Sequence, residues 1–439
     1  MPPLPLLLQL ACLALPFAQA RGSYPTDSGL AAPVLVPLSG ASGGAWRLRS
    51  SANASLRLAA AVPGDLITDL QLGGVIGDPL YEQNFKDPVW DSGNYTYSLT
   101  FGAPAALRAS ASAWLVFEGV KMVADVTLNG QWLGYFNDQF LRYSFPVSPS
   151  ALLAQGNVLE VTFPPFSDPR SLTQRLMGCS GGWDWAPFSG TFINKSVGTF
   201  SKGIWRPVYL AGAGAGGALL AHVAPRVHYK GPYPSAPLTD GSHGDFEVRV
   251  AVHFEAGAGG GAGTLAVVGG WAGGAAAPQR VALPAGNSSV TVVLSAAASA
   301  VRLWWPAHTP GNQTRYPVTA TFTPDGGGAS VQDARKIGFR VFTLVTGNDT
   351  DPATLAGRDG QDHYTMRFKV NGADIWSRGS NMIPMEELEG RTTAEGLRRL
   401  VQSGVEGGFN TFRLWGGGIF QYDAFYDACD EMGVLIYRE

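Results

Sequence analysis

Short apolar segments, split by Gly, Pro and Asn turn signals, recur through most of this chain. This pattern restricts most of the fold to paired β-strands, because a helix would need apolar residues three or four positions apart. In residues 28–212 the spacing of the segments predicts an all-β fold, either a sandwich or a jelly roll. The Asn129-Gly130 pair between two such segments predicts a two-residue hairpin turn.

A second β region covers residues 220–348, where residues 246–254 and 290–294 alternate regularly between apolar and polar side chains. We expect an immunoglobulin-like β-sandwich in this region. The Ala/Gly-rich stretch 213–219 that precedes it is predicted to be a flexible linker. The similar tract 256–276 is predicted to be a loose loop.

From residue 363 onward, predicted strands alternate with predicted helices. Apolar residues recur at helical spacing between strands expected at 376–383 and 410–415, and Thr392 with Glu395 forms a capping-box pattern. Alternating strands and helices predict a parallel sheet, as in a (β/α)₈ TIM barrel. Such a barrel needs roughly 250 residues. We therefore expect residues 363–439 to be the start of a TIM-barrel domain, truncated within its third strand.

The first twenty residues have the features of a signal peptide. An apolar run from Leu4 to Leu15 is followed by Ala18-Gln19-Ala20, which fits the small-residue cleavage pattern. The run is too short to cross a bilayer, and no later segment is predicted to do so. A buried N-terminal helix is the alternative, which four prolines in this segment disfavour. We expect a protein of the secretory pathway, either lysosomal or vacuolar, or extracellular.

Asn-x-Ser/Thr triplets spread over the chain support that location, because they are acceptors for N-glycosylation. The candidate glycosylation sites are Asn53, Asn94, Asn194, Asn287, Asn312 and Asn348.

Charge and cysteine content exclude several function classes. The net charge of −3 gives no basic footprint for nucleic acid. Outside the signal peptide only Cys179 and Cys429 remain, too few for a disulfide framework or a zinc cluster, and both are expected to be buried free thiols. We expect no metal and no cofactor.

Motifs in a fixed order carry a family resemblance. They include Val62-Pro63-Gly64-Asp65, the stretch 179–187 with Trp183-Asp184-Trp185, Gly203-Ile204-Trp205-Arg206, Leu303-Trp304-Trp305-Pro306, and the stretch 410–418 with Arg413-Leu414-Trp415. The series resembles glycoside hydrolases of the β-galactosidase, β-glucuronidase and β-mannosidase superfamily, most closely the β-mannosidases. The resemblance implies a jelly-roll sugar-binding domain, an immunoglobulin-like domain and a TIM barrel. It also implies retaining hydrolysis of terminal β-D-mannose from oligosaccharides.

Asp184, the first substrate-binding candidate, lies between two tryptophans in the sequence. Apolar sugar faces pack on aromatic rings, and a carboxylate accepts hydrogen bonds from sugar hydroxyls. The resemblance implies that Asp184, beside Trp183, grips the terminal mannose. The alternative is a turn-forming Asp next to a buried Trp pair.

Three further candidates lie at the ends of predicted barrel strands, where barrel enzymes place their active groups. The resemblance implies that Trp415 walls the mannose subsite and that Arg413 orients a catalytic carboxylate through a bidentate contact. Asn381 ends the first predicted barrel strand. For Trp415 and Arg413 the alternative is a packed strand end whose following glycines serve only the turn. For Asn381 the alternative is a capping or turn residue.

Retaining hydrolysis needs two carboxyl groups roughly 5 Å apart. The resemblance places them after the fourth and seventh barrel strands, so we expect both beyond residue 439 and no catalytic residue in this chain, which would be inactive alone. Glu386, Glu387 and Glu389 are expected to be solvated. Two alternatives remain: an exo-glycosidase for β-glucuronides, β-galactosides or β-glucosaminides, and a secreted carbohydrate-binding module.

Overall fold

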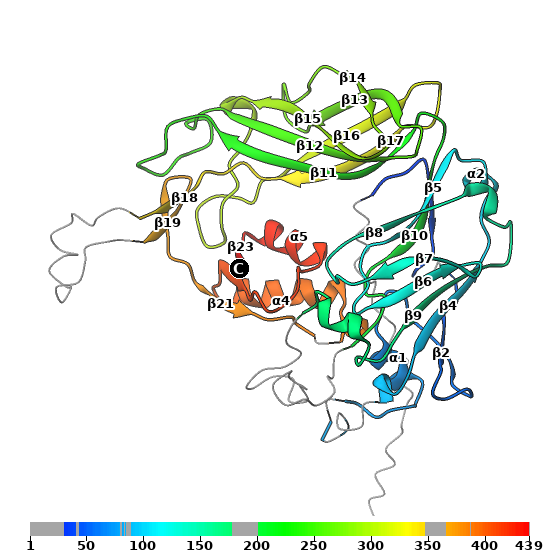
Figure 1. Cartoon of the computed structure of the whole chain (residues 1–439). Helices are drawn as coiled ribbons and strands as arrows, with labels where there is room; N and C mark the ends of the chain where they lie inside the picture. The colour runs from blue at the N-terminus through cyan, green and yellow to red at the C-terminus, as the bar shows by residue number, and fades with distance from the viewer. Residues whose placement is uncertain are drawn as a thin grey trace, which may run out of the picture.

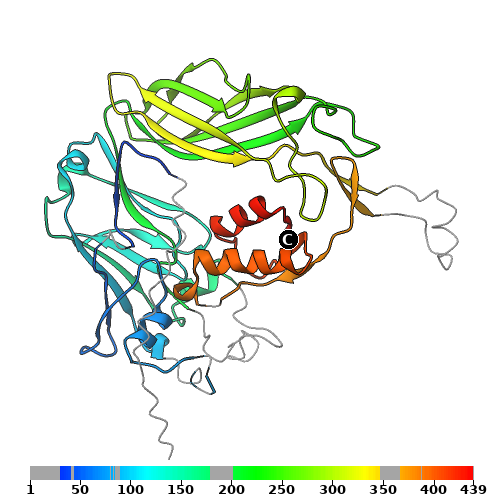
Figure 2. The ribbon, with the colours of Figure 1, turned by 180° about the vertical axis from the view of Figure 1, so that it is seen from behind.

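The computed structural model of this chain describes residues 30–40, 44–79, 81–82, 84, 89–177, 201–346, 366–386 and 388–438. The predicted signal peptide, Cys179, Trp183, Asp184 and two of the candidate glycosylation sites (Asn194 and Asn348) lie outside these residues. Two β-sandwiches flank a smaller α/β unit, which lies in the angle between them (Figure 1). The view from behind shows the same arrangement (Figure 2).

The first sandwich joins a four-stranded sheet, of order β1-β10-β5-β8, to a six-stranded sheet, of order β3-β2-β4-β9-β6-β7. All its strand pairs are antiparallel, and the two sheets share one apolar core. The predicted hairpin is confirmed, because Asn129 and Gly130 both have positive φ, 52° and 78°, between β6 and β7. The elements are β1 (Val34–Pro37), β2 (Arg47–Ser50), β3 (Arg57–Ala59), α1 (Leu66–Leu72), η2 (Val89–Asp91), β4 (Tyr95–Phe101), α2 (Ala105–Arg108), β5 (Ser112–Phe117), β6 (Ala124–Leu128), β7 (Gln131–Phe136), β8 (Tyr143–Val147), η3 (Pro149–Ala151), β9 (Asn157–Phe163), η4 (Pro169–Thr173) and β10 (Val208–Ala213).

The second sandwich packs a three-stranded sheet, β11-β12-β15, on a four-stranded sheet, β14-β13-β16-β17. Alternate residues of β12 are buried, as expected for a strand with one face on a core. The two sheets share a second apolar core. The elements are β11 (Ala218–Tyr229), β12 (Phe246–Ala256), β13 (Gly261–Gly269), β14 (Gln279–Leu283), β15 (Gly286–Ala296), η6 (Ala298–Ala300), β16 (Tyr316–Pro324) and β17 (Val331–Ile337).

Two sequence predictions about Ala/Gly-rich stretches are wrong. The tract 256–276 contains a central strand, β13, where a Cβ on Gly263 would lie 2.3 Å from the Thr323 carbonyl oxygen of β16. Its small residues therefore allow close strand packing. The supposed flexible linker 213–219 is a tight turn between two strands, because β10 ends at Ala213, β11 begins at Ala218, and both residues are buried.

The α/β unit contains the predicted parallel sheet, of order β21-β22-β23, with one helix in each connection. The capping box predicted from Thr392 is off by one residue. The N-cap of α4 is Thr393, whose side-chain oxygen accepts from the Gly396 amide at 3.0 Å. A small antiparallel sheet, β18-β19-β20, precedes this unit. The elements are β18 (Phe342–Val345), β19 (Arg367–Val370), β20 (Ala373–Ile375), β21 (Gly379–Met382), η7 (Glu389–Arg391), α4 (Ala394–Glu406), β22 (Thr411–Leu414), α5 (Asp423–Met432) and β23 (Leu435–Arg438).

One buried ion pair joins the first sandwich to the α/β unit. Lys121 Nζ lies 2.5 Å from Glu389 Oε1, and both side chains are at most 5% exposed. The Ser201 hydroxyl donates to the other carboxylate oxygen of Glu389. The prediction that Glu389 is solvated is therefore wrong, while Glu386 is half-buried and Glu387 lies outside the described residues. The Glu389 prediction failed because its partners are distant in sequence.

The Asp65 carboxylate adds a hydrogen bond between the first sandwich and the same loop of the α/β unit. Asp65 caps α1 through the Thr68 amide and also accepts a hydrogen bond from the Gly390 amide at 2.6 Å. Burial, followed by the nearby charge of Glu389, raises the pKa of the Asp65 carboxyl. Arg391 then binds Asp78 at 3.0 Å at the edge of the contact.

The second sandwich holds the opposite side of the α/β unit. Trp304 Nε1 donates to the Asp430 carbonyl at 2.9 Å, and the Ala307 amide donates to the Gly433 carbonyl at 2.7 Å. Arg315 pairs with Glu431 at 3.0 Å. The α/β unit is thus held between the two sandwiches.

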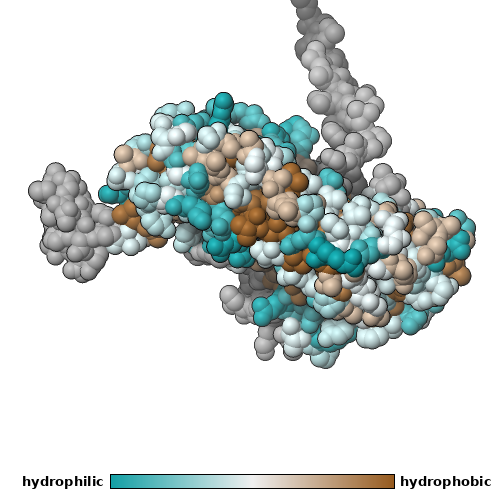
Figure 3. Space-filling model, turned by 90° about the horizontal axis from the view of Figure 1, so that it is seen from above, coloured by the Kyte–Doolittle hydropathy of each residue, from teal (hydrophilic) through white to brown (hydrophobic). Residues whose placement is uncertain are grey.

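Seen from above, polar and apolar residues are interspersed over the surface, with the most apolar area near its middle (Figure 3). No helix in the described ranges combines the length and hydropathy that a membrane crossing needs. Cys429 is a buried free thiol, as predicted, and burial raises its pKa. Asn53, Asn94, Asn287 and Asn312 are exposed, and their glycosylation stays a prediction.

Lys121→Ala is expected to destabilise the chain by about 3–5 kcal/mol, because it leaves the buried Glu389 carboxylate without its countercharge. The measurement is the free energy of unfolding in urea. The matched control is Arg49→Ala, which breaks the exposed Arg49–Glu160 pair and should cost at most about 1 kcal/mol. Equal losses for the two variants would contradict the importance assigned to the buried pair.

Candidate functional site

A cavity of about 650 Å³ opens beside the carboxyl ends of β22 and β23. Carboxyl ends of parallel strands meet at one edge of a sheet, which is where ligand sites gather in α/β folds. The first sandwich forms the opposite wall. The lining residues are Phe140, Ser171, Gln174, Arg175, Leu176, Arg438 and the stretch Leu414–Phe420.

Trp415 is the predicted site residue that lines this cavity, and its indole is half-buried. Its amide donates to the Met382 carbonyl at 3.0 Å, and its carbonyl accepts from the Gly418 amide at 3.1 Å. The glycines after it have a packing role, because a Cβ on Gly417 would lie 2.3 Å from the indole ring. The turn thus fixes Trp415 at the end of β22.

Arg413 and Asn381 contact each other but do not line the cavity. Arg413 Nη1 donates to Asn381 Oδ1 at 2.9 Å, from adjacent residues in the β21–β22 register. Leu414 and Met382 pack among the helices, so alternation places Arg413 and Asn381 on the helix-free face of the sheet. Tyr437, which pairs with Arg413 in the register, extends the same row across β23.

Aromatic and cationic groups that the sequence did not point to also line the cavity. The Arg438 guanidinium carbon lies 3.6 Å from the centre of the Phe420 ring, and Phe140 contacts that ring edge-on at 5.2 Å. Arg438 ends an apolar parallel strand, and the carboxyl end of such a strand is a position at which α/β folds place ligand-contacting groups. Phe140 and Arg175 have no comparable sequence signal, because the fold alone brings them here.

Gln139 fixes the wall contributed by the first sandwich. Its buried side-chain oxygen accepts from the Met177 amide at 2.8 Å, and its backbone N–H donates to the Arg175 carbonyl at 2.8 Å. Its carbonyl accepts from Trp205 Nε1 at 3.1 Å. The segment 171–177, which leads toward the predicted Trp183-Asp184 pair, is therefore held beside Trp415.

The charge of this cavity is positive. Arg175 and Arg438 line it, and within the described ranges no carboxylate does. Described His, Cys, Asp and Glu residues form no cluster of three that could hold a metal ion. The geometry can therefore bind a polyhydroxylated or negatively charged ligand against an indole.

Residues 46–206 match the family described as glycosyl hydrolase 2 galactose-binding domain-like. These residues form a glycosyl hydrolase 2 galactose-binding-like domain. The domain supplies Phe140 and the 171–176 wall of the cavity. The family resemblance inferred from the sequence is therefore confirmed.

The similarity extends well beyond the galactose-binding-like domain. The chain is 31% identical over 434 residues to the β-mannosidase of Rattus norvegicus, an alignment covering 90% of this chain and 44% of that protein. This chain thus spans less than half the length of the relative.

Solved structures agree in fold. A β-D-mannosidase from Dictyoglomus thermophilum matches with a TM-score of 0.70 and 23% identity, covering 92% of this chain and 47% of that one. The exo-chitosanase of Amycolatopsis orientalis matches with a TM-score of 0.65 and 21% identity, covering 92% and 43%.

Gln139→Leu should loosen the wall beside Trp415, because the Met177 amide loses its acceptor. A lost buried hydrogen bond of about 1–3 kcal/mol corresponds to roughly 5- to 150-fold faster amide exchange. Hydrogen-exchange mass spectrometry of a peptide covering residues 171–177 measures this change. Gln155→Leu, at an exposed position, is the control and should leave the peptide unaffected. Unchanged exchange in Gln139→Leu would show that Gln139 does not hold the wall.

Proposed function

We propose that this chain is the sugar-recognising portion of a β-mannosidase-like retaining exo-glycosidase, which removes terminal non-reducing β-D-mannose from oligosaccharides and glycoprotein glycans. The similarity to the rat β-mannosidase supports the substrate. The position of Trp415 beside the galactose-binding-like domain supports the location of the site.

The observation that carries this proposal is that Trp415 and the Arg413–Asn381 pair lie at the carboxyl ends of the neighbouring strands β21 and β22. Trp415 offers a half-buried indole on which the apolar face of a pyranose can pack. The Arg413–Asn381 pair at the same strand ends supplies a fixed guanidinium, whose fork fits a carboxylate or adjacent hydroxyls. Asp184 and Trp183 are proposed to complete this subsite from the galactose-binding-like domain.

Catalysis is proposed to depend on two carboxyl groups from elsewhere in the whole protein. Retaining hydrolysis needs an acid/base and a nucleophile roughly 5 Å apart. The Glu389 carboxylate is already engaged in the buried pair with Lys121. We assign the described residues to recognition and none of them to bond cleavage.

The three structural units are proposed to be domains at 28–212, 220–348 and 363–439, with the last as the start of a (β/α)₈ barrel. Its parallel β21-β22-β23 order supports that assignment. A signal peptide at 1–20 and glycosylation at the six asparagines are proposed to direct and mark a protein of the secretory pathway.

A second candidate function is a carbohydrate-binding module, favoured by the wall that the first sandwich gives to the cavity. In that case the sandwich alone would carry the affinity. A third candidate keeps the enzyme class with a β-glucosaminide as substrate, in line with the fold shared with the Amycolatopsis exo-chitosanase.

Trp415→Ala is expected to weaken binding of methyl β-D-mannoside by roughly 2- to 13-fold, because aromatic stacking contributes about 0.5–1.5 kcal/mol beyond area burial. Isothermal calorimetry of the 439-residue chain measures this affinity. Trp132→Ala is the matched control, since this indole is 58% exposed on β7, away from the cavity. Mannoside binding that survives Trp415→Ala unchanged would favour the binding module.

A hydrolysis assay independently tests the proposal that this chain recognises the sugar but does not cleave the glycosidic bond. The purified chain should release no aryl product from 4-nitrophenyl β-D-mannoside above the rate of a protein-free control. Release of aryl product that Trp415→Ala abolishes would contradict the assignment, because it would place cleavage within this chain.

A further inference from the structure

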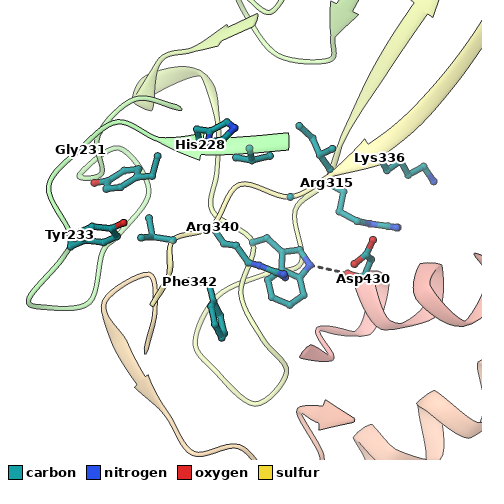
Figure 4. A pocket seen from close by; sticks show the side chains of 14 residues that line it. His228, Gly231, Tyr233, Arg315, Lys336, Arg340, Phe342 and Asp430 are labelled. Atoms are coloured by element: carbon teal, nitrogen blue, oxygen red, sulfur yellow. Dashed lines mark hydrogen bonds between the residues drawn. The ribbon is translucent and has the colours of Figure 1, made fainter. Parts of the chain in front are cut away.

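A second cavity, of about 590 Å³, lies between the second sandwich and helix α5. It shares no lining residue with the cavity beside Trp415. Figure 4 shows side chains from the sandwich converging on it, with Asp430 rising from α5. Its volume lies in the range of small-ligand sites, about 300–1,000 Å³.

Arg340 and Lys336 give this cavity two cations, and the charge of Asp430 acts on Arg340. In the described part of the chain, no carboxylate lies within ion-pair distance of either residue. The Arg340 guanidinium carbon stacks 4.7 Å from the centre of the Trp304 ring, which leaves its N–H edges available. Burial lowers the pKa of Arg340, opposed by Asp430, so its charge is partly desolvated.

Arg315 adds a third cation with spare hydrogen-bonding capacity. Its Nη2 donates to Glu431 at 3.0 Å, while its Nη1 is buried and has no hydrogen-bond partner among the described residues. A buried donor without a partner is costly, and an incoming oxygen ligand would satisfy it.

The one carboxylate in the lining does not balance these charges. Asp430 faces Arg315 and Arg340 (Figure 4), and burial raises its pKa while the two arginines lower it. Glu431, next in sequence, is engaged by both Arg315 and Arg398. Three cations against one lining carboxylate leave the cavity positive and suited to an anion.

Exposed rings at the rim add the chemistry of sugar recognition. Tyr233 is 79% exposed and Phe342 is 46% exposed, so both present ring faces to a ligand. Trp304 offers no such face, because it is buried beneath Arg340. An inorganic anion would contact only the cationic side chains, whereas a charged sugar would contact both the cations and the aromatic rings.

We propose that this cavity binds an anionic saccharide, a sugar unit bearing a carboxylate or a phosphate. Arg340 and Lys336, with Arg315 beneath them, hold the charged group, and Tyr233 or Phe342 packs against the sugar ring. The site is separate from the mannoside cavity and does not depend on hydrolysis.

Calorimetry of the full chain with four probes tests this proposal: glucuronate, glucose 6-phosphate, glucose and inorganic phosphate. We expect glucuronate or glucose 6-phosphate to bind, and whichever binds more tightly identifies the charged group. Glucose should bind at least tenfold more weakly. Raising the salt concentration should weaken binding of the charged sugar.

Variants locate the site. Arg340→Gln should weaken the charged sugar at least tenfold, while Arg249→Gln, on the exposed face of β12, should have no effect. Tyr233→Ala should weaken the sugar phosphate but not inorganic phosphate. Its exposure makes it harmless to folding, and thermal unfolding of each ligand-free variant checks this.

Several results would overturn the proposal. They are the absence of binding by both charged sugars, equal binding of glucose, and binding of inorganic phosphate as tight as that of glucose 6-phosphate. Charged-sugar binding that survives Arg340→Gln in a folded protein would also exclude this cavity.

Discussion

The Glu389 carboxylate is buried between the galactose-binding-like domain and the α/β unit, where the Lys121 ammonium and the Ser201 hydroxyl hold it. Removing two charges from water costs several kcal/mol per ion, and only close pairing with further hydrogen bonds offsets that cost. The arrangement therefore favours one docking geometry over others. The Asp65 contact with the Gly390 amide restricts the same loop a second time.

That docking geometry creates the candidate site, because neither partner forms the cavity alone. The strand ends of the α/β unit bring Trp415 and Arg438, while the domain brings Phe140 and the 171–176 segment. Gln139 holds Met177 next to this wall, and Ser201 contacts Glu389 across the two units. The second sandwich holds the other side of the unit through Trp304 and Arg315.

The sequence predicted the parts of the structure that depend on local signals. Asn129-Gly130 specified its hairpin, because positive φ at both residues suits few others, and periodicity specified the parallel sheet. The Ala/Gly-rich composition of 256–276 led to the wrong prediction of a loop. These small residues instead let β13 lie close to β16. The family resemblance selected Trp415, whereas nothing local pointed to Glu389, whose partner Lys121 is 268 residues away. Phe140 and Arg340 were missed for the same reason.

We propose that Trp415 and the Arg413–Asn381 pair form the sugar-contacting part of a β-mannoside site. The most direct test is a crystal structure of the chain soaked with methyl β-D-mannoside. We expect density for a pyranose ring packed on the Trp415 indole, with its hydroxyls within hydrogen-bond reach of the Arg413 guanidinium. A mannoside bound only to the outer surface of either sandwich, with the indole uncovered, would contradict it.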